Sequence, residues 1–292
     1  MKKLKESELI INPDGSLYHI RLRPEHLARK IILVGDPQRV PMVSSFFDKV
    51  DYIFENREIV THTGYLNKVR LTVMSTGMGP DNIDIVMNEL DALVNVDLIT
   101  RTIKDKHTTL DIVRLGTSGA VQPDIPIDAF AMATHGLGID GLIHFYKHRY
   151  ACDRKMAKAF IRQTRWPKIL PEPYVIKGSS LLETQLGDGF IKGITITAPG
   201  FFGPQGREIR LKAAYPNLNE RITRFRYHDQ RIINFEMETS ALYAFGKMLG
   251  HNTLTICSIL ANRVKETYSR DPKAITKKLT KLLLNRLTGA EL

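Results

Sequence analysis

The sequence predicts a three-layer α/β/α sandwich around a central mixed, largely parallel β-sheet. Short apolar or β-branched runs recur along the chain, each ended by Gly, Pro or a polar residue, as is typical of buried strands. Between them lie segments with apolar residues at i, i+3 and i+4, the spacing of helices that bury one side. Strands that alternate with helices indicate a mainly parallel sheet covered on both faces.

The elements follow from these patterns in chain order. The clearest expected strands are Lys30–Val34, Val69–Ser75, Ile112–Leu115, Gly193–Ala198 and Leu254–Leu260. Helices are expected at Asp81–Leu93, Thr239–Leu249 and Lys273–Leu287, and Asp81 is expected to cap the first of them. That helix carries an apolar stripe made of Ile83, Val86, Met87, Leu90 and Leu93. The segment Lys147–Gly178 has three prolines near its end, and we expect a helix plus an irregular excursion there.

Length and composition favour one cytoplasmic domain over residues 1–292. The chain is 43% hydrophobic and 25% charged, an ordinary globular composition. Its two cysteines, Cys152 and Cys257, lie far apart, and no metal-ligand spacing is present, so a reducing compartment is expected. The charged segment Met1–Leu9 lacks the apolar run of a signal peptide, and no window approaches the ~18 apolar residues of a membrane span. We therefore expect no membrane partner.

The formal net charge of +11 raises the alternative of a nucleic-acid-binding protein. Aromatic residues are not regularly interleaved with the lysines, as a stacking platform for bases requires. A solvated basic surface is the favoured interpretation, and no nucleic-acid partner is expected.

Three glycine-containing segments follow apolar runs, namely Gly35–Arg39, Ser75–Pro80 and Arg114–Gly119. Loops at the carboxyl ends of strands hold the ligands of open α/β sheets. Glycine lets backbone N–H groups approach an anion closely, although strand-to-helix turns also use glycine for conformational reasons alone. None of the three segments has the spacing of a Walker A loop or a dinucleotide fingerprint.

Arg114 lies within the apolar run Ile112–Leu115, where an unpaired guanidinium is costly. One interpretation pairs it with a structural carboxylate. The other makes it a phosphate ligand together with Arg39 and the hydroxyl of Thr117, because the planar fork of arginine suits bidentate contact with phosphate oxygens.

A second constellation is the acidic segment Asn234–Thr239, expected to open a helix. Glu236 and Glu238 suit a helix start, where acids complement the dipole. Two carboxylates around Met237 also suit a sugar, because carboxylates accept hydrogen bonds from hydroxyl groups. Composition alone favours the helix start.

The chain resembles the nucleoside phosphorylase superfamily, and within it the uridine phosphorylases. The matching segments are VGDPQRV, NREI, STGMGP, VRLGTSGAVQP, FFGPQGR, NFEMETSALYA and LANRVKE. They occur in the order of the family and extend over about residues 19–266, nearly the whole chain.

The resemblance implies a role for each matching residue. Phosphate would be held by Gly35, Arg39, Arg114 and Thr117, with Arg57 supplied by a neighbouring subunit. Ribose would be bound by Glu236, Met237 and Glu238, with His19 contributed across the interface. The base pocket would consist of Phe201, Gln205, Arg207 and Arg263. A homodimer would be the minimal unit, with a hexamer left open.

The Phe-x-x-x-Gln-x-Arg spacing also has a chemical meaning. A uracil edge presents two acceptors and one donor, which a glutamine amide and an arginine can satisfy together while the ring stacks on the base. A glycine- and proline-rich turn with a solvent-exposed Gln and Arg is the alternative. Purine-cleaving members place an aspartate after the strand that corresponds to Leu254–Leu260, whereas Leu260–Arg263 contains none.

We therefore expect phosphorolysis of uridine or a close pyrimidine nucleoside, such as 2′-deoxyuridine or thymidine. Inorganic phosphate would be the co-substrate, with no metal and no organic cofactor. A purine nucleoside phosphorylase or a nucleosidase of the same fold is the alternative.

Overall fold

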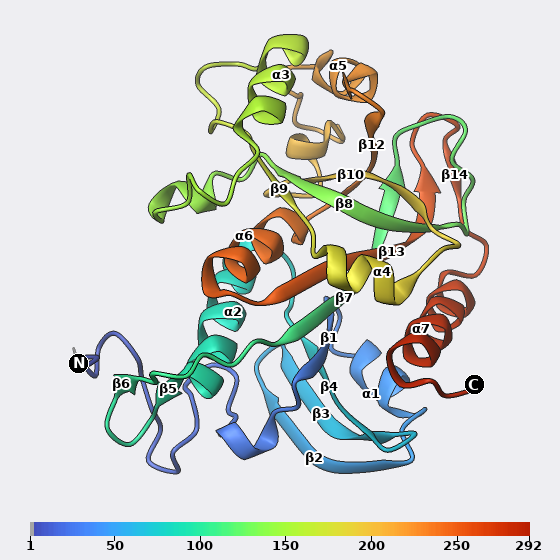
Figure 1. Ribbon diagram of the computed structural model, residues 1–292. Helices are drawn as coiled ribbons and strands as arrows, with labels where there is room; N and C mark the ends of the chain where they lie inside the picture. Colours follow the sequence, from blue (N-terminus) through green and yellow to red (C-terminus); the bar gives the residue numbers. More distant parts are fainter. Residues whose placement is uncertain (1–2) are drawn as a thin grey trace.

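The computed structural model describes residues 3–292 and contains a sheet of 12 strands flanked by helices (Figure 1). The strands of this sheet are β1 (Lys30–Val34), β2 (Lys49–Asn56), β3 (Ile59–Leu66), β4 (Val69–Ser75), β7 (Asp111–Ala120), β8 (Phe130–Gly138), β9 (Tyr174–Lys177), β10 (Ile191–Thr197), β11 (Arg226–Tyr227), β12 (Gln230–Glu236), β13 (Asn252–Asn262) and β14 (Thr267–Tyr268). A separate pair consists of β5 (Val96–Asp97) and β6 (Thr102–Ile103).

All α-helices but the last, which follows β14, lie between strands in the sequence. The α-helices are α1 (Arg39–Ser44), α2 (Pro80–Asn95), α3 (Arg154–Thr164), α4 (Ser180–Leu186), α5 (Leu218–Arg224), α6 (Thr239–Leu249) and α7 (Pro272–Thr288). Residues 3–292 also contain three short 3-10 helices: η1 (Pro24–His26), η2 (Leu142–Phe145) and η3 (Gly203–Gln205).

The sheet is mixed, with a parallel centre. Strand β1 lies between β4 and β7 and is parallel to both, and β13 is parallel to β7. Strands β8, β10 and β12 are parallel to one another, whereas β13 pairs with β8 in the antiparallel sense. The end of β12 pairs with the end of β7, which closes β7, β12, β10, β8 and β13 into a ring.

Helices cover both faces of the sheet, which confirms the expected three layers. Helices α2 and α6 pack together on one face, and α1, α4 and α7 lie on the other (Figure 1). Within residues 3–292, no helix combines the length and the apolar composition that crossing a bilayer would require.

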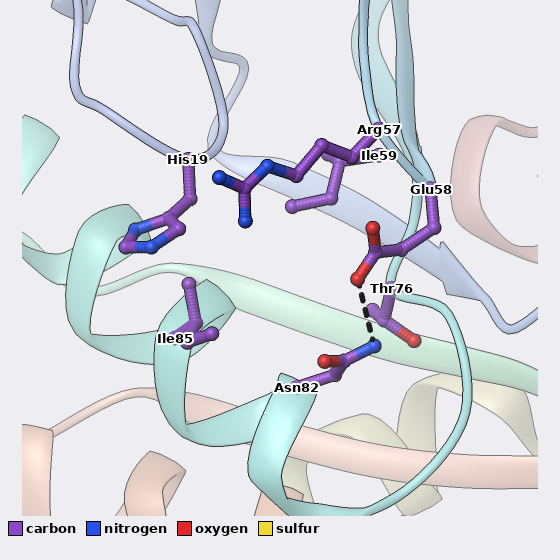
Figure 2. A pocket seen from close by; sticks show the side chains of 7 residues that line it. All are labelled: His19, Arg57, Glu58, Ile59, Thr76, Asn82 and Ile85. Atoms are coloured by element: carbon purple, nitrogen blue, oxygen red, sulfur yellow. Dashed lines mark hydrogen bonds between the residues drawn. The ribbon is translucent and has the colours of Figure 1, made fainter.

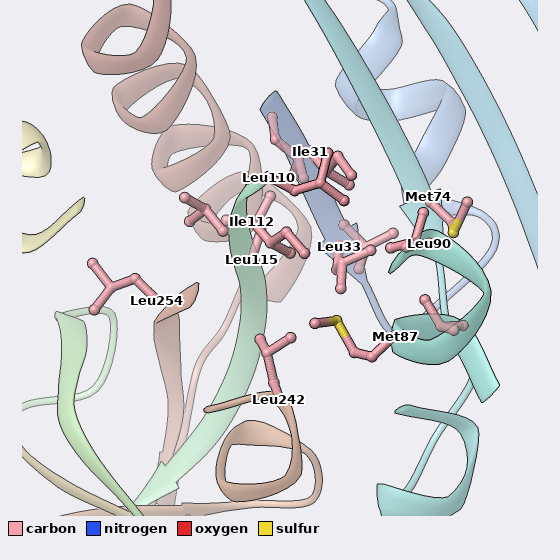
Figure 3. Close-up of a cluster of buried hydrophobic side chains, with 14 of the residues drawn as sticks. Ile31, Leu33, Met74, Met87, Leu90, Leu110, Ile112, Leu115, Leu242 and Leu254 are labelled. Atoms are coloured by element: carbon pink, nitrogen blue, oxygen red, sulfur yellow. The ribbon is translucent and has the colours of Figure 1, made fainter. Parts of the chain in front are cut away.

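The main core lies between the parallel strands and the pair α2 and α6. Figure 3 shows Leu33 of β1 and Leu115 of β7 facing Met87 of α2, with Leu242 of α6 close by. All of them are fully buried, and burying one such side chain contributes roughly 1.5–3 kcal/mol. The predicted stripe of α2 is buried throughout. This packing fixes both helices against the sheet and so places the loops at the carboxyl ends of β1 and β4.

Several local expectations are corrected. Asp81 does not cap α2, because Pro80 begins the helix and Gly79 precedes it with φ +102°, a conformation that favours glycine. Arg114–Gly119 is not a loop, because β7 continues to Ala120 while paired with β13. The segment Lys147–Gly178 contains the expected helix, α3, but its end forms strand β9 against β8.

Candidate active site

Arg114 is the buried centre of the site. Its side chain emerges from β7 and is 5% exposed. Its Nη2 donates to Oε2 of Glu238, and its Nη1 lies 3.4 Å from Oε2 of Glu236. Burial alone would lower the pKa of Arg114, but the two carboxylates raise it above its ordinary value, so the guanidinium is charged. Within residues 3–292, its Nε has no hydrogen-bond partner.

Gly116 makes room for this guanidinium. Residues 114 and 116 point to the same side of β7, and a Cβ at position 116 would lie 2.1 Å from Nη1 of Arg114. The same Cβ would lie 2.9 Å from Sγ of Cys257 on β13. Only glycine leaves the space in which the arginine folds back along its own strand.

A second cation lies beside Arg114. Arg39, at the start of α1, has Nη2 3.4 Å from the hydroxyl oxygen of Thr117 on β7. Burial lowers the pKa of Arg39, and the positive charge of Arg114 lowers it further. Gly35 begins the connection from β1 to α1, and next to it the N–H of Thr76 donates to the carbonyl of Val34 at 2.8 Å, so the segments after β1 and β4 touch. Two neighbouring guanidinium groups next to a hydroxyl and glycine-rich backbone form an arrangement suited to an anion.

The acidic segment Asn234–Thr239 is not the first turn of a helix, because β12 extends to Glu236 and α6 begins only at Thr239. The carboxylate of Glu236 accepts from the N–H groups of Glu238 and Thr239 at 2.9 Å each, as a helix-start acid does. It also accepts from the hydroxyl of Thr197 at 2.6 Å. Glu238 instead reaches Arg114 and the N–H of Gly79, at 2.9 Å. Met237 lies between them, half-buried.

The segment Phe201–Arg207 forms a tight turn around η3. Nη1 of Arg207 donates to Oε1 of Gln205 at 2.6 Å and to the carbonyl of Phe201 at 2.7 Å. The guanidinium carbon of Arg207 lies 3.8 Å from the centre of the Phe201 ring, a cation–π contact. Gln205 is buried, whereas half of Phe201 is exposed. The predicted base residues are therefore assembled into one cluster with an accessible aromatic face.

Arg263, which follows β13, joins this cluster. Its Nη2 donates to the backbone carbonyl of Gln205. Burial lowers the pKa of Arg263 to about 10, and the charge of Arg207 contributes to that shift. Burial also lowers the pKa of Arg207. Because the charge of Arg207 acts on Arg263, a ligand with electronegative atoms would relieve the repulsion between the two guanidinium groups.

His19 and Arg57 form a separate part of the site. They line a small pocket with Thr76, the first residue after β4, and Figure 2 shows the guanidinium of Arg57 extended toward His19. Nδ1 of His19 lies 2.6 Å from Oε1 of Glu89 on α2. Neither Arg39 nor Arg114 is among the residues that line this pocket. Two of the predicted residues thus stand apart from the rest.

Two supporting residues were missed by the sequence reasoning. Glu89 is buried on α2 and holds both the ring of His19 and its backbone N–H, and a glutamate beside the apolar stripe was the available signal. Thr197 ends β10 and fixes Glu236, but a threonine at a strand end carries no distinctive signal.

A cluster of Asp91, His107 and His251 lies at the amino-terminal ends of β7 and β13, away from the site. The N–H of Leu110 donates to Nδ1 of His251, so the ring proton resides on Nε2, 3.2 Å from Oδ1 of Asp91. Nε2 of His107 likewise donates to the carbonyl of Leu249 at 2.9 Å. In this tautomer Nε2 of His251 carries a proton and has no lone pair for a metal ion, so we assign no metal to this cluster.

Comparison with known proteins gives consistent matches over most of the chain. A uridine phosphorylase of Thermococcus kodakarensis is 28% identical over 270 residues, which are 92% of this chain and 86% of the relative. A DeoD-type purine nucleoside phosphorylase of Clostridium perfringens is 25% identical over 91% of this chain and 97% of the relative. A Trypanosoma brucei nucleoside phosphorylase that shows uridine phosphorylase activity superposes with a TM-score of 0.87 at 28% identity, covering 97% of this chain and 100% of that one.

The sequence profile of the phosphorylase superfamily matches residues 29–287. This range contains the buried arginine, the acidic pair and the base turn described above. On the extent of that match, the chain belongs to the phosphorylase superfamily.

Proposed function

We propose that this protein is a uridine phosphorylase, which converts uridine and inorganic phosphate reversibly to uracil and α-ribose 1-phosphate. The observation that carries the proposal is the cluster of Phe201, Gln205 and Arg207. The similarity to relatives named uridine phosphorylase supports the same substrate. Its donors and its accessible ring match the edge and the face of a uracil.

Phosphate is assigned to the space beside Arg39, Arg114 and Thr117, next to Gly35. The support is electrostatic: each guanidinium lies in the field of the other, and Nε of Arg114 is a buried donor without a partner within residues 3–292. A phosphate with close to two negative charges would stabilise both cations. We assign it as co-substrate, with no metal or organic cofactor.

Ribose is assigned chiefly to Glu238. Among residues 3–292, the hydrogen-bond donors to its carboxylate are Arg114 and the N–H of Gly79. Glu236 already accepts from a hydroxyl and two backbone N–H groups. We therefore assign Glu236 to holding the start of α6, and ribose binding by Glu236 itself stays a prediction. Met237, half-buried between the two acids, would pack on the apolar side of the sugar.

The reaction breaks the C1′–N1 bond of the nucleoside and forms a C1′–O bond to phosphate with inversion. The proton that hydrogen phosphate gives up in forming this bond ends on N1 of the released uracil. As the glycosidic bond lengthens, positive charge develops on the ribose and negative charge on the uracil. Phosphate held by the arginines lies next to the first charge, and Arg207 with Gln205 offsets the second. Catalysis then consists of positioning and preorganised electrostatics, without a covalent enzyme intermediate.

His19 and Arg57 are proposed to complete the site of a neighbouring subunit, so that a homodimer is the smallest active unit and a hexamer of three dimers is compatible with it. This accounts for two predicted ligands that stand apart from Arg114 within their own chain. Mixed oligomers of Arg57→Ala and Arg114→Ala subunits should regain activity, because one shared site would contain both arginines. Verified mixed oligomers without any rescue would contradict a shared site.

The function is tested by a uridine-to-uracil assay on the purified protein, with and without phosphate, alongside inosine and thymidine. We expect release of uracil that depends on phosphate, with inosine inert. Cleavage of inosine would favour the purine branch, to which the Clostridium relative belongs. Release without phosphate would indicate a nucleosidase, and no turnover would revive the nucleic-acid-binding alternative.

A further inference from the structure

The backbone carbonyl of Gln205 is held by two side chains from distant parts of the chain. The turn itself uses the N–H groups of Gln205, Gly206 and Arg207, which donate to the carbonyls of residues 202 and 203. The carbonyl of Gln205 instead accepts from Nδ2 of Asn219, on α5, at 2.8 Å. Its second donor is Nη2 of Arg263. Side chains therefore fix the peptide plane between residues 205 and 206.

Gly206 shows how closely Asn219 is fitted to this turn. It has φ +68°, and a Cβ at this position would lie 2.1 Å from Nδ2 of Asn219. The amide of Asn219 therefore packs directly on the bare backbone of the turn. Helix α5 is a firm support for that contact, because Ile222 anchors it in a buried hydrophobic cluster.

We propose that Asn219 is a positioning residue for recognition of the nucleobase. This role rests on the proposed function. Asn219 sets the plane of the peptide that follows Gln205, and this plane determines where the Gln205 amide and the guanidinium of Arg207 lie. Asn219 belongs to α5, whereas the phosphate and ribose residues lie on other elements. Its loss should therefore weaken nucleoside binding and leave phosphate binding unchanged.

The test compares Asn219→Ala and Asn219→Asp with the wild type in steady-state phosphorolysis. The aspartate keeps the volume of the side chain but has no N–H to donate. A hydrogen bond contributes modestly to positioning, so we expect the KM for uridine to rise about 3- to 10-fold in both variants. The KM for phosphate and the unfolding temperature should stay at their wild-type values.

Asn217→Ala is the matched control, because Asn217 is exposed and its side chain does not cap α5. It should leave both KM values unchanged.

The outcomes separate the two proposals. If the wild type cleaves uridine and the Asn219 variants keep its KM, or lose only kcat or folded protein, the positioning role is overturned. If the wild type cleaves inosine instead, the proposed substrate is wrong, and the same shift in nucleoside KM still tests Asn219. A wild type inert toward uridine, thymidine and inosine removes the proposed function and the role of Asn219 with it.

Discussion

The Arg114–Glu238 pair predicts that phosphate and a protein carboxylate compete for one buried cation. Replacing Glu238 by glutamine removes the charge that contacts Nη2 of Arg114 and leaves Glu236 at 3.4 Å. Breaking a buried ion pair costs about 3–5 kcal/mol, and we expect the lower end because Glu236 remains. For a chain of 292 residues, ~3 kcal/mol corresponds to a fall in Tm of about 5 °C.

Phosphate should restore part of this loss. On the proposed assignment, phosphate shares Arg114 with Glu238 in the wild type, whereas in Glu238→Gln only Glu236 and phosphate remain as counter-ions of that guanidinium. Phosphate should therefore stabilise the variant by about 1–2 kcal/mol more than the wild type, or roughly 2–3 °C in Tm. The assay is thermal unfolding of both proteins over a series of phosphate concentrations, with sulfate-free buffer.

Glu220→Gln is the control, because Glu220 forms an exposed pair with Arg224, and such pairs contribute only about 0–1 kcal/mol. It should change neither Tm nor the response to phosphate. The reasoning is refuted if Glu238→Gln unfolds within about 1 °C of the wild type, or if phosphate raises its Tm no more than that of the wild type.

Three further predictions concern the site and the pH dependence of stability. Gly116→Ala should lower kcat/KM by about 10²-fold or more in the phosphorolysis assay, since its methyl group would displace the guanidinium of Arg114. Gly119→Ala, where a methyl group would meet only ordinary contacts at 3.5 Å, should change kcat/KM little. Arg207→Ala should raise the KM for uridine about 10-fold or more without changing the KM for phosphate, and equal changes in both would contradict its assignment to the base. Burial lowers the pKa of His135 and of His62 below the ordinary value of 6.5. The stability that these neutral side chains contribute is therefore present above about pH 6.5 and is lost as the pH falls toward their folded-state pKa values. Urea unfolding at about pH 7.5 and about pH 5 should show this loss, reduced in His135→Asn; an unchanged loss would mean that other groups cause it.

Local patterns determined much of the fold. The runs Lys30–Val34 and Val69–Ser75 are strands with the predicted bounds, and the stripe on α2 is buried as expected. These features are readable because strand and helix periodicity depend on neighbouring residues alone. The limits of β7 were wrong, because its continuation to Ala120 depends on pairing with β13 and β12, which no local pattern encodes.

Within the candidate site, the sequence by itself determined which residue types carry chemistry, and its resemblance to the superfamily indicated which ligand each residue would bind. Only the tertiary structure decided which of these residues contact one another. Arg114 and Glu238 are 124 residues apart, and they meet because the end of β12 pairs with the end of β7. Asn219 reaches the carbonyl of Gln205 because α5 is anchored beside the turn. A hydrogen bond depends on distance and direction in space, and these arise only once the strands have closed into a ring.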